Sequence, residues 1–188
     1  MSILNSIKLF IHPRVMTMLF LGFSAGVPIL LIFSTLGLWL NEAGVVKSTI
    51  TFFSWAALGY SFKFVWAPLV DRLPLPFLTK ALGRRRAWML VSQLAIMVAI
   101  ILMSSVDPNA SIESLTIMAY GAVLLGFSSA TQDIVIDAYR IESADMNMQS
   151  MLSATYIAGY RIGMLVAGAG GLFIASYLGS TKELYSYE

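Results

Sequence analysis

The sequence predicts an all-α, multi-pass membrane protein, on the evidence of its composition, its charge spacing and the placement of its basic residues. Of the 188 residues, 58% are hydrophobic and only 12% are charged, with a mean hydropathy of +0.79. A water-soluble domain carries roughly 25% charged residues. The apolar gaps between the charges are long enough for helices of about 20 residues, the length that crosses a bilayer.

Five apolar segments are predicted to span the membrane within a single membrane domain covering residues 1–188. They are about 15–40, 50–70, 87–105, 114–139 and 151–178. The first segment is too long and ends in residues too bulky for a cleavable signal peptide. The connections are short, so none of them can fold as a separate globular domain.

The distribution of basic residues predicts an N-terminus in the cytoplasm. In that orientation eight basic residues lie on the cytoplasmic side and only Lys47 and Lys182 lie outside. The cytoplasmic set is Lys8, Arg14, Arg72, Lys80, Arg84, Arg85, Arg86 and Arg140. Because cytoplasmic loops of membrane proteins are enriched in Lys and Arg, this asymmetry decides the orientation. Topology also explains the arginine run, so we expect no nucleic-acid partner.

Few residues in the chain could hold a metal or form a disulfide. There is no cysteine and only one histidine, while the net charge is +2. Disulfide frameworks and thiolate metal sites are therefore excluded, and a multi-histidine centre is disfavoured. We expect no metal and no cofactor.

Four ionisable residues inside the apolar segments are the strongest candidates for function: Lys63, Asp133, Asp137 and Arg161. Each isolated charge costs about 2.5 to 3.5 kcal/mol at the centre of a membrane helix, so it normally has a partner or lines a water-filled cavity. Asp133 and Asp137 are four residues apart and share one helix face.

The depths of these residues predict which of them meet. At about 1.5 Å per residue, Lys63 and Asp133 both lie roughly 10 to 12 Å from the cytoplasmic boundary. We therefore predict two stacked ion pairs, Lys63 with Asp133 and Asp71 with Arg140. Arg161 lies roughly 15 Å deep by the same rise. It has no predicted fixed partner, so it is a candidate for binding an anionic group of a ligand.

Structural interpretations of these residues stand beside the functional ones. Asp137 and Arg140 lie close enough to the interface to be solvated helix ends. Lys63 and Asp133 could form a buried pair that only specifies packing, or could take part in proton coupling or substrate passage.

Small residues recur every four positions in the last segment, at Gly159, Gly163, Ala167 and Gly171. Such a stripe allows another helix backbone to approach closely. The same spacing occurs in the first segment at Gly22 and Gly26. We interpret both as helix-packing surfaces without chemistry.

The connection between the second and third segments carries a family resemblance. It contains Asp71-Arg72 and ends with Gly83-Arg84-Arg85-Arg86, and this order resembles the signature loop of the major facilitator superfamily. A longer spacing and Ala67 at the helix end are typical of one branch, the AmpG-type muropeptide permeases. Five segments are similar to that branch, in the same order: FLGFSAGVPILL (20–31), YSFKFVWAPLVDR (60–72), GRRRAW (83–88), ATQDIVIDAYR (130–140) and GYRIGMLVAG (159–168).

The resemblance implies a proton-coupled importer of anhydro-muropeptides in the bacterial inner membrane, working by rocker-switch alternating access. Its implied partners are the lipid bilayer, a muropeptide-like solute and protons. The candidates for the substrate or proton pathway lie within the matching motifs and are Lys63, Gln132, Asp133, Asp137 and Arg161. The candidates for a cytoplasmic gate are Asp71, Arg72, Gly83, Arg84, Arg85, Arg86 and Arg140.

The length of the chain departs from this family, whose members have twelve or more spans. We expect either a truncated, transport-inactive fragment or one part of a split transporter that needs a separate C-terminal half. An intramembrane enzyme using Asp133 and Asp137 is disfavoured. Membrane phosphotransferases place more carboxylates around a metal, and intramembrane aspartyl proteases place their two aspartates on different helices.

Overall fold

The structure is a computed structural model that describes residues 12–178, a range that folds into helices joined by short connections and contains no strand. Four helices in this range are long and apolar enough to cross a membrane: Pro13–Glu42, Arg84–Ser104, Ile112–Ser143 and Met146–Leu178. The predicted all-α, multi-pass membrane class is confirmed. Lys182, predicted to lie outside the cell, and Lys8, predicted to lie on the cytoplasmic side, are both outside the described range.

Two of the long helices contain a π-helical turn. The first consists of α2 (Pro13–Leu30), η1 (Leu31–Thr35) and α3 (Leu36–Glu42), and the last consists of α10 (Met146–Leu165), η3 (Val166–Gly170) and α11 (Gly171–Leu178). Pro28 lies one turn before η1, where its ring removes a backbone donor. The two π turns contact each other, so the irregular backbone of one helix packs on that of the other.

Residues 50–70, which we expected to form one span, are divided into short helices. These are α4 (Lys47–Phe52), the 3₁₀ turn η2 (Phe53–Ala56), α5 (Ala57–Ser61) and α6 (Lys63–Arg72). The break lies at Phe62, whose backbone angles are φ −103° and ψ 10°. This segment is therefore not among the four long helices, and Lys63 begins a new helix directly after the break.

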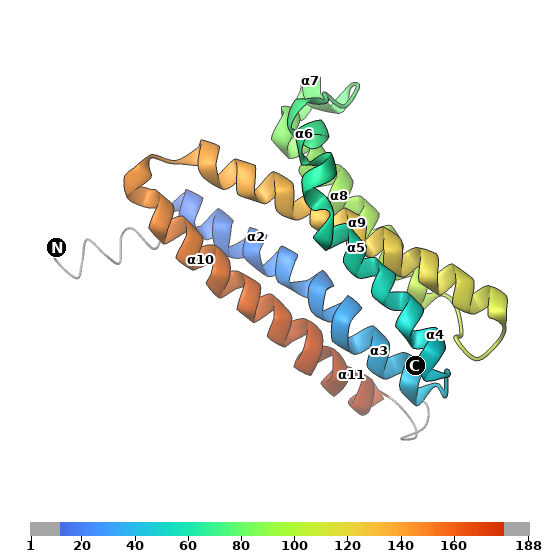
Figure 1. Cartoon of the computed structure of the whole chain (residues 1–188). Coiled ribbons are helices and arrows are strands. Elements are labelled where there is room, and N and C mark those ends of the chain that lie inside the picture. The colour runs from blue at the N-terminus through green and yellow to red at the C-terminus, as the bar shows by residue number, and fades with distance from the viewer. Residues whose placement is uncertain (1–11, 179–188) are drawn as a thin grey trace.

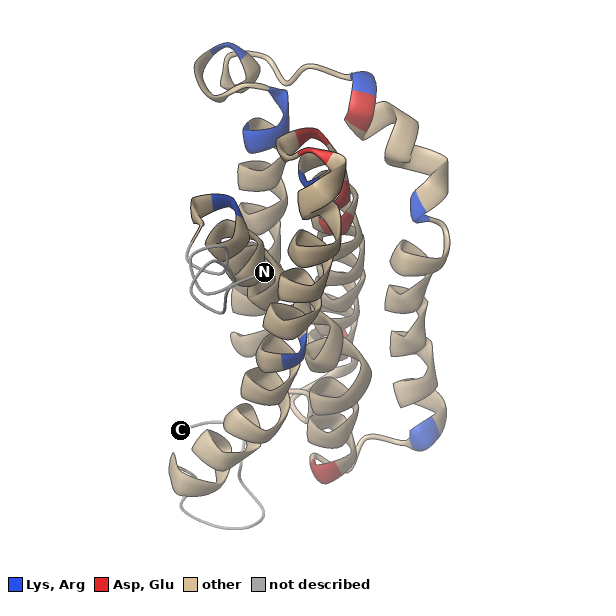
Figure 2. Cartoon of the chain, turned by 90° about the vertical axis from the view of Figure 1, so that its left-hand side faces the viewer, with Lys and Arg blue, Asp and Glu red and all other residues tan. Residues whose placement is uncertain are grey.

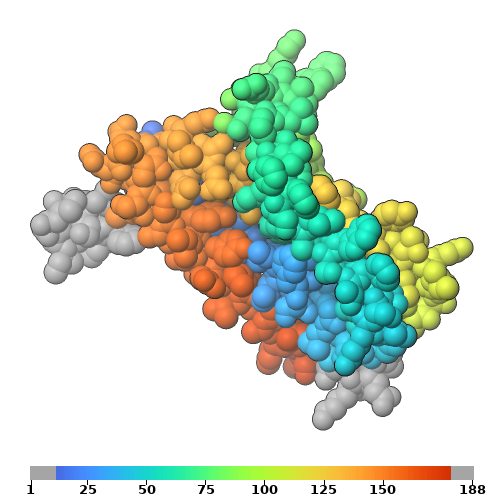
Figure 3. All heavy atoms as spheres, in the orientation of Figure 1, coloured from blue at the N-terminus to red at the C-terminus, as the bar shows by residue number. Residues whose placement is uncertain are grey.

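The helices form two side-by-side pairs joined through α9. The helix α2 lies along α10, and α8 (Arg84–Ser104) lies along α9 (Ile112–Ser143), while α5 and α6 cross α9 (Figure 1). In the space-filling view, α4 to α6 form a ridge across the molecule, and α2 is visible between this ridge and α10 (Figure 3). The short helix α7 (Leu78–Leu82) projects beyond the bundle.

Glycine permits the closest helix contact, between α2 and α10. A Cβ atom added at Gly159 would overlap the carbonyl oxygen of Leu19, and one added at Gly163 would overlap that of Phe23. In return, Gly22 and Gly26 of α2 lie directly against the backbone of α10. Backbones can approach this closely only where side chains are absent.

The other two residues of the small-residue stripe are placed differently. Ala167 is buried in η3. A Cβ atom at Gly171 would meet no other described atom within 4 Å, so this glycine lies outside the close contact with α2.

Most charged residues gather at one end of the bundle (Figure 2). Here α2 and α8 begin and α6 and α9 end, so Arg14, Arg72, Arg84–Arg86 and Arg140 share this end. We call it the arginine-rich end. By the positive-inside rule it is the end expected to face the cytoplasm.

Candidate functional site

Arg85 is the centre of an ion-pair network at the arginine-rich end. Its Nη1 lies 2.6 Å from Asp71 Oδ1 at the end of α6, and its Nη2 lies 2.6 Å from Glu142 Oε1 at the end of α9. The Arg85 Nε also donates to Glu142 Oε2 at 3.1 Å. The Arg85 side chain is only 17% exposed, and its guanidinium joins three helices. Arginine suits this role because its planar group presents donors in several directions.

The predicted ion pair between Asp71 and Arg140 is wrong. Arg140 instead donates to Asp137 Oδ1 at 3.2 Å and to Ser153 Oγ of α10 at 2.7 Å. The reason is the packing of the helices. The start of α8 brings Arg85 to the end of α6, while Arg140 lies on the side of α9 that meets α10.

The remaining gate candidates surround this network without joining it. Arg72, Arg84 and Arg86 are exposed and make no ion pair or hydrogen bond within the described residues. Gly83 lies between α7 and α8 with φ +81°, a conformation that favours glycine. Trp88 Nε1 donates to the Leu73 carbonyl at 2.9 Å and holds the connecting loop against α8.

Sequence reasoning missed Glu142 as a member of this network. The available signal was an acidic residue at the inner end of the fourth apolar segment, on the same side of the membrane as the arginine run. Its partner could not be read from the sequence because 57 residues separate it from Arg85.

Asp133 is the polar residue at the centre of the membrane-embedded part of the site. Its Oδ1 atom is buried and has no hydrogen-bond partner in the described part of the chain. Lys63 and Asp137 are close enough to interact with it electrostatically. However, the predicted direct ion pair between Lys63 and Asp133 is not formed, because none of the ion pairs within 4.0 Å among residues 12–178 joins them.

Three tyrosines from two other helices interact electrostatically with Asp133. Tyr60 of α5 and Tyr156 and Tyr160 of α10 all lie within its electrostatic reach. Tyr60 donates to Ser129 Oγ at 2.6 Å, and the rings of Tyr156 and Tyr160 are 6.0 Å apart. Sequence reasoning did not single out these tyrosines, because no spacing along the chain relates them to Asp133.

Gln132, next to Asp133 in the sequence, is fully buried with an exposed fraction of 0%. Its Nε2 donates to Ser24 Oγ of α2 at 2.9 Å, whereas its Oε1 has no partner within residues 12–178. This hydrogen bond links α9 to α2. The Oε1 atom therefore retains an unused acceptor inside the bundle, where a buried donor such as a water molecule can bind it.

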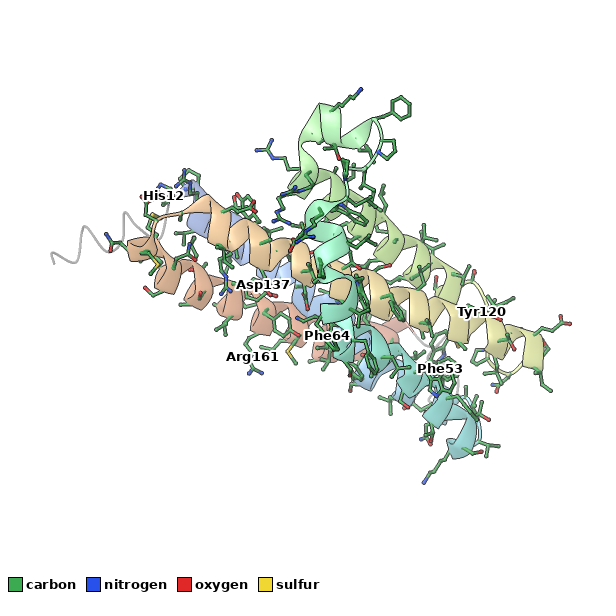
Figure 4. All side chains as sticks on the ribbon, turned by 45° about the horizontal axis from the view of Figure 1, so that its top comes forward. His12, Phe53, Phe64, Tyr120, Asp137 and Arg161 are labelled. Atoms are coloured by element: carbon green, nitrogen blue, oxygen red, sulfur yellow. The ribbon has the colours of Figure 1, made fainter. Side chains whose placement is uncertain are left out.

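Arg161 is not part of the Asp133 cluster. It is exposed on α10, and Figure 4 shows its side chain pointing away from the bundle, whereas Asp137 lies near the middle of the view. Among the described residues it makes no ion pair or hydrogen bond. The same range contains no group of three or more His, Asp or Glu residues arranged to hold a metal.

These features place a gate-like ion network at one end of the bundle and a set of polar groups within its apolar interior. The family described as "Acetyl-coenzyme A transporter 1" matches residues 14–182, which include every candidate site residue. The chain belongs to this transporter family.

Curated relatives named as AmpG-type transporters are similar to most of the chain. It is 41% identical over 177 residues to "Putative transporter AmpG 4" of Rickettsia conorii, covering 94% of the chain and 42% of the relative. It is 39% identical over 169 residues to "Anhydromuropeptide permease" of Escherichia coli K12, covering 90% of the chain and 33% of the relative. The predicted resemblance to AmpG-type transporters is therefore confirmed.

The chain corresponds to less than half of each of these relatives. The chain spans 42% of the length of the first relative and 33% of the second. The chain is a multi-pass membrane protein of a transporter family.

Proposed function

We propose that this chain forms part of a secondary transporter that imports anhydro-muropeptides, or related cell-wall sugar-peptides, across the bacterial inner membrane together with protons. The observation that carries the proposal is the buried, unpartnered Oδ1 atom of Asp133 within the helix bundle of a transporter-family protein. Intramembrane carboxylates of this kind mark proton relays and substrate paths.

The surroundings of Asp133 support a role in proton transfer. The Asp133 Oδ1 atom can accept a proton or a hydrogen bond without breaking an existing contact. Lys63, at the break between α5 and α6, is a nearby cation that can compete for the carboxylate. A carboxylate held permanently in an ion pair stays deprotonated. A site that exchanges protons therefore needs a cation that can approach the carboxylate and leave it again.

The sugar-peptide part of the proposal draws on the relatives and on the chemistry of the site. The Escherichia coli relative is named for anhydromuropeptide. The tyrosine rings suit a sugar-containing solute, because small-molecule sites are lined by aromatic side chains and a few polar groups that orient the ligand. Arg161 is a candidate for an anionic group of the solute.

Uptake of labelled anhydro-muropeptide tests the proposal in cells that lack their own permease. We expect no uptake by the chain alone. We expect uptake when it is co-expressed with the C-terminal part of the Escherichia coli relative, abolished by a protonophore. Uptake that a protonophore leaves unchanged would contradict proton coupling.

A competition arm tests the substrate class. Because the matching family is described as an acetyl-coenzyme A transporter, unlabelled acetyl-coenzyme A is the informative competitor. We expect unlabelled muropeptide, and not acetyl-coenzyme A, to suppress the uptake. If acetyl-coenzyme A suppresses the uptake and unlabelled muropeptide does not, the sugar-peptide assignment is wrong.

A further inference from the structure

A cavity separate from the Asp133 cluster opens at the arginine-rich end, between α2, α8 and α9. It has a volume of about 500 Å³. Leu21 of α2 and Met89 and Leu90 of α8 line its apolar part. Arg85 and Arg86 line it at the start of α8, so its charged groups lie toward the end of the bundle. This volume lies in the range typical of small-molecule sites.

The cavity carries positive charge that the described residues do not neutralise. Arg85 is held by Asp71 and Glu142, but Arg86 makes no ion pair or hydrogen bond within residues 12–178. No acidic side chain lines the cavity. An occupant that contacts Arg86 should therefore bear negative charge.

The apolar part of the cavity continues onto an exposed stripe of α8. Leu90, which is 37% exposed, is followed on the same helix face by Leu94, Met97 and Ile101, all of them exposed. These residues follow the spacing of one helix face, at steps of four, three and four. The stripe begins at the edge of the cavity, and burying it against an acyl chain is favourable because it removes apolar surface from water.

We propose that this cavity binds one anionic phospholipid, with its phosphate against Arg86 and an acyl chain running past Leu90 onto the α8 stripe. Basic pockets between membrane helices on the cytoplasmic side suit anionic headgroups. The proposal is independent of the transported solute. Because Arg85 also lines the cavity, the bound lipid lies beside the network that joins α6, α8 and α9, and it stabilises that network.

Native mass spectrometry of the purified full chain tests the proposal, with equal amounts of phosphatidylglycerol and phosphatidylcholine added in detergent. We expect retention of one phosphatidylglycerol in preference to phosphatidylcholine. The Arg86→Gln variant should retain about fivefold less phosphatidylglycerol, the effect of removing one basic contact with an anionic headgroup. Arg84→Gln is the matched control, since Arg84 is exposed, does not line the cavity and carries the same charge.

A second pair of variants tests the cavity without changing charge. Leu90→Trp should fill it and reduce phosphatidylglycerol retention, whereas Leu165→Trp, which is exposed on α10 and belongs to neither the cavity nor the α8 stripe, should leave retention unchanged. Circular dichroism of each variant establishes that it keeps its helix content.

Several outcomes would overturn the proposal. Equal losses in Arg84→Gln and Arg86→Gln would indicate diffuse surface attraction in place of a site. Equal retention of the two lipids, or full retention by Leu90→Trp, would exclude this cavity as the binding place. If inorganic phosphate at the same concentration as phosphatidylglycerol displaces it completely, the acyl chain contributes nothing to binding, and the cavity is a phosphate site and not a lipid site.

Discussion

Arg85 shows how much of this molecule depends on a single side chain. Its guanidinium contacts the carboxylates of Asp71 in α6 and Glu142 in α9. The Asp71 and Glu142 side chains are 46% and 51% exposed, whereas the Arg85 side chain is 17% exposed. A single exposed ion pair contributes little to the free energy of unfolding. Here one guanidinium holds two carboxylates, so only one cationic side chain loses conformational entropy. Arg84 and Arg86 flank it and make no such contact within the described residues. Arg86 lines the cavity beside α2 and Arg84 does not, so the three arginines lie in three different environments.

Replacing Arg85 with lysine keeps the charge and removes the fork of donors. We expect Arg85→Lys to lower the free energy of unfolding by about 1 kcal/mol, because an ammonium group cannot hold Asp71 and Glu142 with the same geometry. Unfolding in mixed micelles measures the change, with Arg84→Lys as the control. An equal loss in both variants would mean that the network does not contribute to stability.

Asp133 is the residue on which the proposed proton coupling depends. In the co-expressed transporter, Asp133→Asn should abolish proton-driven uptake while leaving membrane insertion intact, because the amide keeps the shape of the side chain and cannot exchange a proton. Asp145→Asn, at the exposed start of α10, is the matched control and should keep full uptake. Full uptake by Asp133→Asn would remove Asp133 from the proton path.

The contact between α2 and α10 is the closest packing of whole elements in the described bundle. Gly22 and Gly26 of α2 pack against the backbone of α10, and Gly159 and Gly163 of α10 pack against the backbone of α2. A shift of one helix along the other would therefore cause atomic overlap. The neighbouring segment α4 to α6 is different, because its break at Phe62 divides it into short helices. One side of α9 therefore meets a rigid helix pair, and another side meets a segmented helix that carries Lys63.

Gly159→Ala tests this packing. The added methyl group would overlap the Leu19 carbonyl, and we expect a loss of about 1 to 3 kcal/mol in the free energy of unfolding, the usual range for overpacked sites. Gly171→Ala is the control, since its methyl group would meet no described atom within 4 Å. That variant should be neutral or slightly stabilising, because alanine favours the helix. Similar losses for both glycines would show that the contact is not specific.

The orientation of the whole molecule follows from the arginine-rich end. The chain contains no cysteine, so single introduced thiols report accessibility without background labelling. In intact cells we expect Ala110→Cys, in the loop before α9, to react with an impermeant maleimide. Ala81→Cys, in α7, should react only after the membrane is permeabilised. The reverse pattern would place the arginine-rich end outside the cytoplasm and contradict the positive-inside prediction.

The sequence was a good guide to features that depend on one helix at a time. The α-helical membrane class follows from long apolar runs, and the close approach at Gly159 and Gly163 follows from their four-residue spacing. The break before Lys63 was not predicted, although an ionisable residue inside an apolar run was its visible sign. The three tyrosines that interact electrostatically with Asp133 were missed because they come from α5 and α10, far from Asp133 in the chain.

The sequence by itself therefore determined that this is a helical membrane protein, which end carries its basic residues and which ionisable groups lie inside its apolar segments. These properties depend on composition and on the 3.6-residue repeat. Only the tertiary structure decided the partners: Arg85 with Asp71 and Glu142, Arg140 with Asp137, and Asp133 near Lys63 without a direct ion pair. Partner choice depends on how helices cross and rotate against one another. The sequence predicts that two residues lie at the same depth in the membrane, but it does not predict the direction in which each side chain points.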